Sequence, residues 1–146
     1  MSLFQSFNIS ASGMTAQRFR TDIIAENIAN INTTRTEDGG PYRRKIVTFG
    51  EKDVTAFSQI YSASKNAAVG NGVKVTSVKE DTETDFIMEY DPANPDADEN
   101  GYVSYPNVNT VTEMTNLIDA TRAYEANTTA FNASKAMAQT GLSIGQ

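Results

Sequence analysis

Residues 109–142 constrain the fold most, because they contain no proline and, before Gly141, no glycine. A set of residues recurs through this stretch at alternating steps of three and four: Met114, Leu117, Thr121, Tyr124, Thr128, Phe131, Lys135, Ala138 and Leu142. This spacing is typical of one continuous helix with a narrow hydrophobic seam, as in helices that wrap around each other. At ~1.5 Å per residue, such a helix is roughly 45–50 Å long, more than a chain of this size needs to enclose a core.

The opposite side of the same helix carries smaller residues with the same spacing. We call them the alanine seam: Ala123, Ala126, Ala130, Ala133 and Met137. A helix with large side chains on one face and small ones on the other can pack on both faces. Because a monomer would leave one face unused, we expect neighbouring chains, and we predict that another subunit's helix approaches the alanine seam.

The ends of the long helix are marked by polar and glycine residues. Thr110 and Glu113 have the spacing of a capping box, and Asn109 is the alternative cap. Gly141 and Gly145 are expected to end the helix.

The N-terminal segment, residues 3–31, also lacks proline, and its apolar residues lie near one helical stripe. Arg18 and Thr21 interrupt the stripe, and Gly13 costs a helix interior about 1 kcal/mol relative to alanine. We predict a helix with a weak first third that forms half of an antiparallel pair with the C-terminal helix. The asparagines that follow, Asn27 and Asn30 among them, are expected to end it, because their side chains compete for backbone hydrogen bonds.

Residues 35–108 have the short apolar runs and turn signals of a small β-rich insert. Strands are predicted at residues 46–49, 73–78, 86–90 and 102–105, and no element is assigned to 51–68. The strand at 86–90 is expected to be an edge strand with one wet face, joined by an Asn-Gly turn to the next. The basic run at 42–45 is interpreted as a charged start of the first strand in preference to a grip for an acidic partner.

These elements together predict a mainly α fold with a small β insert. The expected organisation is an N-terminal helix and signature (1–34), a β-rich and loop insert (35–108) and a long C-terminal helix (109–146). The two terminal helices are expected to pack as a coiled-coil-like pair.

Composition excludes several classes of function. The net charge of −6 argues against nucleic acid, whose phosphates need a basic surface. The absence of histidine and cysteine removes thiol nucleophiles, the Ser-His-Asp arrangement and zinc sites built on those residues. No apolar run of ~18 residues could span a membrane, and residues 1–12 lack the features of a secretory signal. We expect no enzyme, no cofactor and no direct membrane span; export by a route that reads no cleavable signal stays open.

One motif in the acidic run at 80–100 resembles half of a calcium-binding loop. Asp96, Asp98 and Asn100 alternate and are followed by Gly101. The twelfth position is Asn107 in place of the glutamate that grips calcium with both oxygens, and the first flanking helix is missing. A simple Asn-Gly turn is therefore the preferred interpretation, and we expect no metal site.

Four strings spread over the chain carry a family resemblance. NIANINTT at 27–34 closely resembles the signature near the N-terminus of bacterial flagellar rod and hook proteins. GGPYRRK at 39–45, DPANPDADENGYVSYPNVN at 91–109 and EMTNLIDATRAYEANTTAFNASKAM at 113–137 narrow the resemblance to the proximal-rod members of that family.

The resemblance implies a structural subunit of the rod that crosses the periplasm, exported without a cleaved signal through the flagellar type III apparatus. It implies assembly with further copies, other rod proteins and the hook–basal-body adaptor. Residues of the signature and the C-terminal helix would form the assembly interface: Asn27, Ile28, Asn30, Asn32, Leu117, Tyr124, Phe131 and Met137, joined by Ala130 of the alanine seam. Another axial flagellar protein is the alternative, followed by a calcium-binding or carboxylate-based enzyme domain.

Overall fold

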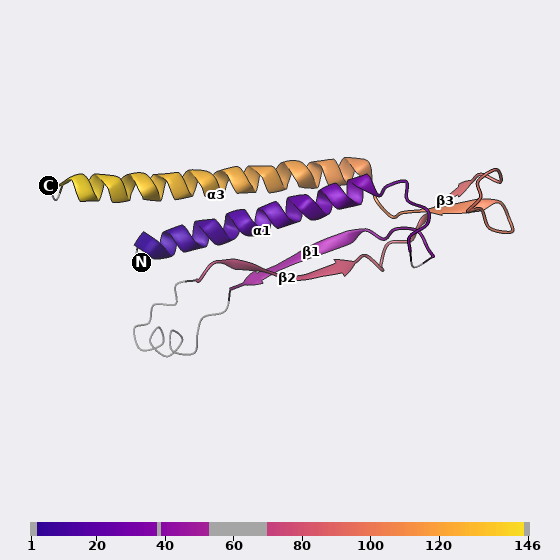
Figure 1. The fold of residues 1–146 in the computed structure, drawn as a ribbon, viewed down its shortest axis with the longest axis horizontal. Helices are drawn as coiled ribbons and strands as arrows, with labels where there is room; N and C mark the ends of the chain where they lie inside the picture. The colour runs from indigo at the N-terminus through magenta and orange to yellow at the C-terminus, as the bar shows by residue number, and fades with distance from the viewer. Residues whose placement is uncertain (1–2, 38, 53–69, 145–146) are drawn as a thin grey trace. The chain divides into compact units, whose positions relative to one another are not determined.

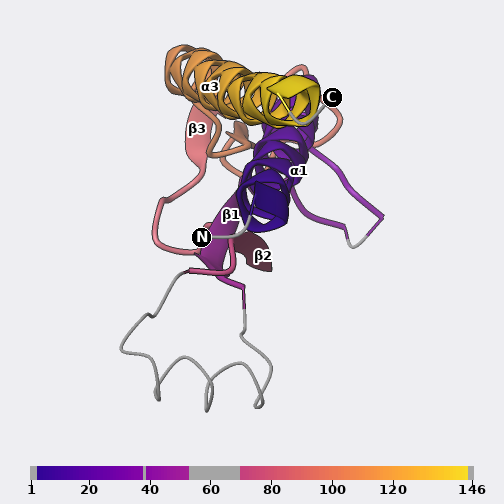
Figure 2. The same cartoon turned by 90° about the vertical axis from the view of Figure 1, so that its left-hand side faces the viewer.

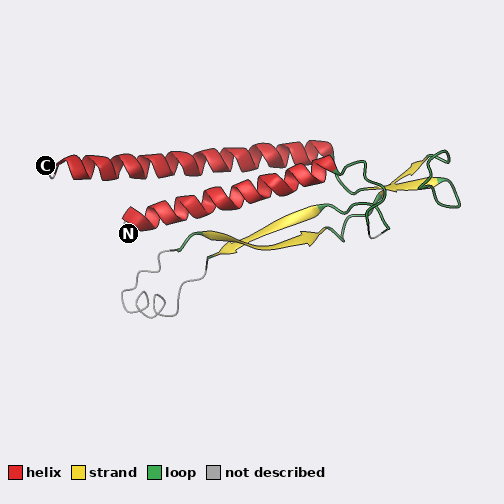
Figure 3. Ribbon diagram, in the orientation of Figure 1, coloured by secondary structure: helices red, strands yellow, loops and turns green. Residues whose placement is uncertain are grey.

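The computed structural model describes residues 3–37, 39–52 and 70–144 (Figure 1). Within these ranges, the chain forms two long helices and four strands, and the strands lie between the helices in chain order (Figure 3). In chain order the elements are α1 (Leu3–Ala29), β1 (Lys45–Glu51), β2 (Val73–Glu80), β3 (Ile87–Tyr90), β4 (Tyr102–Tyr105) and α3 (Thr110–Ile144). The prediction of two terminal helices and a small β-rich middle is confirmed, and each predicted strand is present. Most of the stretch without an assigned element lies outside the described residues.

The start of α3 is capped by Asn109, whose Oδ1 accepts a hydrogen bond from the backbone N–H of Thr112 at 3.1 Å. The capping-box prediction with Thr110 and Glu113 is wrong. With Asn109 as the cap, the residue three positions later is Thr112, and the Glu113 side chain instead binds Asn27 and Arg44. The prediction that Gly141 ends the helix is also wrong, since α3 continues to Ile144. A cost of about 1 kcal/mol for one glycine does not stop a helix of this length. Gly145 lies outside the described residues.

The strands form two separate two-stranded sheets, β1 with β2 and β3 with β4. The N–H of Asp81 donates to the carbonyl of Arg44 at 2.8 Å, and the N–H of Lys52 donates to the carbonyl of Gly72 at 2.9 Å. Because each bond joins the start of one strand to the end of the other, β1 and β2 run antiparallel.

The hairpin of β3 and β4 is also antiparallel, with Ile87 opposite Tyr105 and Tyr90 opposite Tyr102. Its turn contains Gly101 at a φ of 81°, a conformation that favours glycine. Asn100 and Gly101 do lie in a turn, in which the Gly101 N–H donates to the Asp98 carbonyl at 3.0 Å. The prediction that a simple Asn-Gly turn joins the two strands is wrong, because residues 91–101 lie between β3 and β4. The expectation of one covered face on β3 is wrong, because every residue of this strand is exposed.

Contacts divide the chain into two compact units. Unit 1 comprises Met1–Phe19, Thr48–Ser77 and Ala120–Gln146, and unit 2 comprises Arg20–Val47 and Val78–Asp119. Each unit therefore contains a piece of both helices and of the β1–β2 sheet.

In unit 1, α1 contacts α3 on one side and β2 on another (Figures 1 and 2). The rings of Phe7 and Phe131 lie 5.0 Å apart. A Cβ on Gly13 would lie 2.6 Å from Oδ1 of Asn127. These pairs show that the two helices run antiparallel, as predicted. They also give Gly13 a role that the sequence did not reveal, because it lets α3 approach closely.

In unit 2, the same antiparallel arrangement brings the end of α1 to the beginning of α3. Arg20 Nη2 donates to Oδ1 of Asn116 at 3.3 Å, and Asn27 Nδ2 donates to Oε2 of Glu113 at 3.1 Å. The buried apolar residues of this unit are Ile24, Tyr42, Val103 and Val108. Polar contacts therefore join the helices directly beside this small core.

Candidate functional site

Asn27, the first residue of the NIAN string, is the centre of a buried polar network in unit 2. Its side chain is 1 % exposed. Nδ2 donates to the Lys45 carbonyl at 2.9 Å and to Oε2 of Glu113 at 3.1 Å. Oδ1 accepts from the Tyr42 hydroxyl and from the Lys45 N–H, both at 2.9 Å. Because an asparagine amide offers two donors and two acceptor positions, its bonding capacity is fully used.

Glu113 is the charged member of the network and is fully buried. Its Oε1 accepts from Nε of Arg44 at 2.9 Å and from Nη2 of the same guanidinium at 2.7 Å. Oε2 accepts the hydrogen bond from Nδ2 of Asn27. A buried carboxylate is tolerated only when it is paired and hydrogen-bonded, and Arg44 and Asn27 together supply that compensation.

Tyr42 closes the network on the side of β1. It is buried, and its hydroxyl donates to Oδ1 of Asn27. Burial, followed by the nearby charges of Glu26, Glu113 and Glu80, raises the pKa of Tyr42 to about 12. The hydroxyl therefore stays protonated and remains a donor throughout the physiological pH range.

Asn107 ties the chain before α3 into the same network. Its Oδ1 accepts from the Arg44 N–H at 2.9 Å, and its Nδ2 donates to the carbonyls of Asp81 and Thr84 at 3.0 and 3.1 Å. The pKa of the Asp81 carboxyl is lowered, first of all by the hydrogen bond from the Thr84 N–H. Burial raises this pKa, but the bonds from the Thr84 N–H and hydroxyl together outweigh it. Arg44 adds a smaller effect in the same direction, with Nη1 lying 3.7 Å from Oδ2.

This network joins four segments that are distant in sequence: the end of α1, residues 42–45, residues 81–84 and the chain that leads into α3. Its amide and carboxylate groups are satisfied by partners within the chain, so none is held ready for a substrate. The arrangement is that of a junction that fixes the relative positions of these segments within unit 2.

The acidic residues of the calcium-like motif also make contacts within the chain. Asp96 accepts from the Thr34 hydroxyl at 2.8 Å and lies 3.6 Å from Nη1 of Arg35. Oδ1 of Asp98 accepts from the N–H groups of Asn100 and Tyr102, both at 2.8 Å. Across the described ranges, no three histidine, cysteine, aspartate or glutamate side chains come together as a metal ion would require. No helix in those ranges is long and apolar enough to cross a bilayer.

The basic run at 42–45 leads into β1 as predicted, and each of its charged side chains also makes a contact with another segment. Arg44 binds Glu113, Lys45 binds Glu26, and the Arg43 guanidinium lies 4.3 Å from the centre of the Phe86 ring. Sequence reasoning missed Tyr42, Arg44, Asn107 and Glu113 as members of one site. The sequence offered no direct signal for them, because Glu113 has the spacing of a capping residue with Thr110, and the arginines at 43 and 44 lie far from it along the chain.

The predicted interface residues fall into two groups. In unit 2, Asn27 is buried, Ile28 and Leu117 are half-buried, Asn32 is exposed, and Asn30 donates to the Glu26 carbonyl at 2.9 Å. In unit 1, Phe131 contacts Phe7, whereas the remaining three are exposed: Tyr124, Ala130 and Met137. The structure therefore brings Asn27 into an internal network and leaves Tyr124, Ala130 and Met137 exposed.

Comparison with known proteins shows similarity to flagellar basal-body rod proteins along the whole chain. Residues 7–35 match a family described as flagella basal body rod protein, and residues 99–144 match one described as flagellar basal body rod FlgEFG protein C-terminal. The flagellar basal-body rod protein FlgC of Bacillus subtilis is 45% identical, with all of both chains covered. The chain belongs to the FlgC family of flagellar basal-body rod proteins.

Other FlgC relatives give the same result. The protein of Borreliella burgdorferi is 44% identical, with 100% of this chain and 99% of the relative covered. The Escherichia coli O6:H1 protein is 41% identical, with full coverage of both. This chain is accordingly a structural component of the flagellar basal-body rod that assembles with other rod components, and it is not an enzyme. The resemblance seen in its sequence motifs is confirmed.

Proposed function

We propose that the chain is a subunit of the proximal rod and polymerises into the helical tube that transmits torque across the periplasm. The observation that carries this proposal is the full-length similarity to FlgC proteins, joined to a long helix whose apolar residues face outward. On α3 these exposed residues include Met114, Ile118, Met137 and Leu142. Large apolar side chains that stay exposed on a helix support contacts with neighbouring subunits.

The alanine seam is the proposed contact for a helix of another subunit. Ala126, Ala130 and Ala133 are exposed, and Met137 and Ile144 continue the same face of α3 at helical spacing. Small side chains allow two helix backbones to approach closely, which favours coiled-coil-like packing between subunits. In this arrangement residues 1–34 and 109–146 form the inner core of the tube, and residues 35–108 form its outward insert.

Substituting Ala130 tests the seam. Ala130→Leu should prevent incorporation into rods and abolish motility of a strain that lacks its own FlgC, while the purified variant keeps the circular dichroism of the parent chain. Ala136→Leu is the matched control, because Ala136 is also exposed on α3 but lies off the seam. Normal rods and swimming with Ala130→Leu would contradict the proposed contact.

Membership in the FlgC family supports two further proposals about partners. We infer that the chain passes through the flagellar type III export apparatus without a cleaved signal and contacts the hook–basal-body adaptor protein at the base of the rod. Mass spectrometry of the chain recovered from isolated basal bodies tests the first point, since an intact N-terminus is expected. Site-specific photocrosslinking to the adaptor tests the second, and crosslinks to other rod proteins alone would contradict it.

A further inference from the structure

The β3–β4 hairpin of unit 2 has an open backbone edge on the side of β3. The N–H of Asp91, the residue after β3, donates to the carbonyl of Gly101, the residue before β4, at 3.0 Å. In an antiparallel pair, the N–H and C=O groups point toward the partner strand at every second residue. Glu89 therefore directs these groups at β4, whereas Met88 and Tyr90 direct theirs at the outer edge of β3.

The matching edge of β4 is closed by the loop that joins the two strands. Tyr102 donates its N–H to Oδ1 of Asp98, and its carbonyl accepts from the Asp98 N–H, both at 2.8 Å. Asp98 thus supplies one acceptor and one donor, as a residue of a neighbouring strand would. In the part of the chain that the structure describes, no group does this for Met88 or Tyr90.

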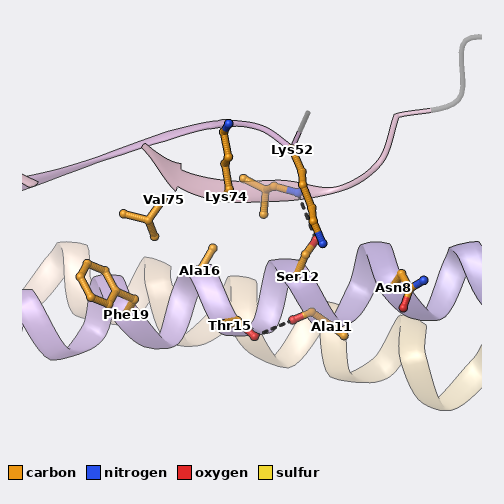
Figure 4. A pocket seen from close by; sticks show the side chains of 10 residues that line it. Asn8, Ala11, Ser12, Thr15, Ala16, Phe19, Lys52, Lys74 and Val75 are labelled. Atoms are coloured by element: carbon orange, nitrogen blue, oxygen red, sulfur yellow. Dashed lines mark hydrogen bonds between the residues drawn. The ribbon is translucent and has the colours of Figure 1, made fainter. Parts of the chain in front are cut away.

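In the other sheet, α1 binds the first outward residue of each strand; both residues face outward because the residue just before each binds the neighbouring strand. In unit 2, the N–H and C=O of Lys45 bind the side-chain amide of Asn27. In unit 1, the N–H of Val73 donates to Oγ of Ser12 at 3.1 Å, and Figure 4 shows Ser12 reaching this strand from α1. Covering an edge hinders pairing with a further strand. Among the four described strands, β3 alone lacks such a contact.

The surroundings of β3 are acidic. Residues 80–100 contain nine acidic residues and no basic one. Asp85, Glu89 and Glu99 are exposed, and none of the three forms an ion pair within the described ranges. A strand added beside β3 meets this negative charge, which favours lysine or arginine opposite Glu89.

Apolar side chains flank Glu89 on the opposite face of β3. The Ser104 hydroxyl contacts the Met88 sulfur at 3.1 Å, and the rings of Tyr90 and Tyr102 lie 5.3 Å apart. Met88 and Tyr90 nevertheless stay 54% and 65% exposed. Because side chains alternate between the two faces of a strand, a segment with apolar residues on either side of a basic one matches this edge.

We propose that β3 accepts an extended segment of a different protein as an additional strand, and that this segment carries a lysine or arginine between apolar residues. Main-chain hydrogen bonds to Met88 and Tyr90 would hold the segment, and the basic side chain opposite Glu89 would select it. This contact is separate from the one proposed at the alanine seam, and neither depends on the other.

A second copy of this chain fits the edge less well. Antiparallel pairing of two β3 strands, in the register that uses both outward residues, places Glu89 against Glu89, and like charges directly opposite are destabilising. The basic run at 42–45 is already engaged within unit 2. The string VKV at 73–75 has the required pattern, but these residues are half-buried on the strand that α1 covers in unit 1.

Peptides titrated into the purified full chain test the proposal. The probe is the peptide TTVKVTT, blocked at both ends. In amide NMR spectra at millimolar peptide, the N–H groups of Met88 and Tyr90 should shift and exchange more slowly with solvent. The peptide TTVEVTT should bind roughly tenfold more weakly, because it places like charges opposite each other.

Methylation of the peptide backbone distinguishes strand addition from charge attraction alone. With the lysine opposite Glu89, the two valine N–H groups face β3 and the lysine N–H faces away. N-methylation of both valines should abolish binding, whereas N-methylation of the lysine should change affinity by no more than about twofold.

Variants of the chain test the same contact from the other side. Met88→Pro removes an outward N–H without removing a bond to β4, a position where a strand tolerates proline, and should weaken binding of TTVKVTT roughly tenfold. Glu89→Lys should reverse the preference between the two peptides. Glu37→Lys is the matched control, because it changes the net charge equally at an exposed position away from β3 and should leave the preference unchanged.

Several results would overturn the proposal: equal binding of the two peptides, binding that survives methylation of the valines, or unchanged N–H groups of Met88 and Tyr90 at millimolar peptide. Self-association of the chain that Met88→Pro abolishes would show that a second copy occupies the edge, against the choice of a different protein. The Ala130→Leu chain should bind TTVKVTT like the parent chain, so the two proposed contacts can fail separately.

Discussion

The clearest stability prediction concerns Asn27, whose amide makes four hydrogen bonds within unit 2. Replacing it with alanine removes the common partner of Lys45, Tyr42 and Glu113. Glu113 and the Tyr42 hydroxyl are buried, so water does not take the place of the lost amide there. Lys45 is half-buried, so water can replace part of the hydrogen bonding that its backbone would lose.

The magnitude follows from these environments. Each buried group that loses its partner costs about 1–3 kcal/mol, and a bond replaced by water costs about 0.5–1.5 kcal/mol. Summed over the two buried partners and the two Lys45 backbone bonds, Asn27→Ala should lower the free energy of unfolding by roughly 3–9 kcal/mol, against a typical total of about 5–15 kcal/mol. Asn27→Asp should be at least as damaging at neutral pH, because it turns a carboxylate oxygen toward Oε2 of Glu113, which lies 3.1 Å from the present nitrogen.

Urea unfolding followed by circular dichroism at the helical band measures the effect, with the slope checked for change. The matched control is Asn32→Ala, because Asn32 belongs to the same signature but is exposed, and it should stay within about 0.5 kcal/mol of the parent chain. A loss below about 1 kcal/mol for Asn27→Ala, or equal losses at both positions, would refute the role of Asn27 as the centre of the network.

Two further predictions test one contact in each unit, Tyr42 in unit 2 and Gly13 in unit 1. The pKa of Tyr42 is raised to about 12 from an ordinary value of 10, so the unfolded chain loses its proton first. The stabilisation is fully present below pH 10, and roughly 2–3 kcal/mol should be lost between pH 10 and 12; Tyr42→Phe should flatten this part of a urea-midpoint profile, and an unchanged profile would count against the assignment. In a helix interior, replacing glycine with alanine usually raises the free energy of unfolding by about 1 kcal/mol. Gly13→Ala alone should not give this gain, because the new Cβ would meet the Asn127 side chain. Gly13→Ala combined with Asn127→Ala should give it, relative to Asn127→Ala alone. Thermal melts of the four variants decide this, and a full gain from Gly13→Ala alone would show that α3 is not held close there.

Local patterns in the sequence predicted the elements well. The proline-free ends gave both helices, and turn residues bounding short β-branched runs gave the strands. The cap of α3 was harder, because Thr110 and Asn109 offered two chemically reasonable solutions separated by one residue. Gly141 was misleading for a related reason: a glycine permits a helix to end, but nothing local compels it to end there.

The candidate site was not predictable in the same way. Asn27 belongs to a recognisable string, yet its partners lie at residues 42–45 and at Glu113, and no periodicity connects positions so far apart. Glu113 had a local explanation as a cap, which concealed its tertiary role. The two seams of α3 had the right period, but the side chains buried along that helix include Glu113, Ala120 and Ser134, which belong to neither.

These buried residues explain how a long helical pair can keep apolar residues on its outside. In unit 2, α1 and α3 meet through Asn27 with Glu113 and Arg20 with Asn116, whereas Met114 and Ile118 face outward. Apolar contacts tolerate sliding, but a slip by one helical turn of about 5.4 Å would leave buried polar groups without partners. Polar contacts within the chain therefore fix the register of α1 on α3, and the apolar residues left outside supply association with neighbours. A rod subunit must present the same outer faces at every addition, and the network around Asn27 meets that requirement by making other registers costly.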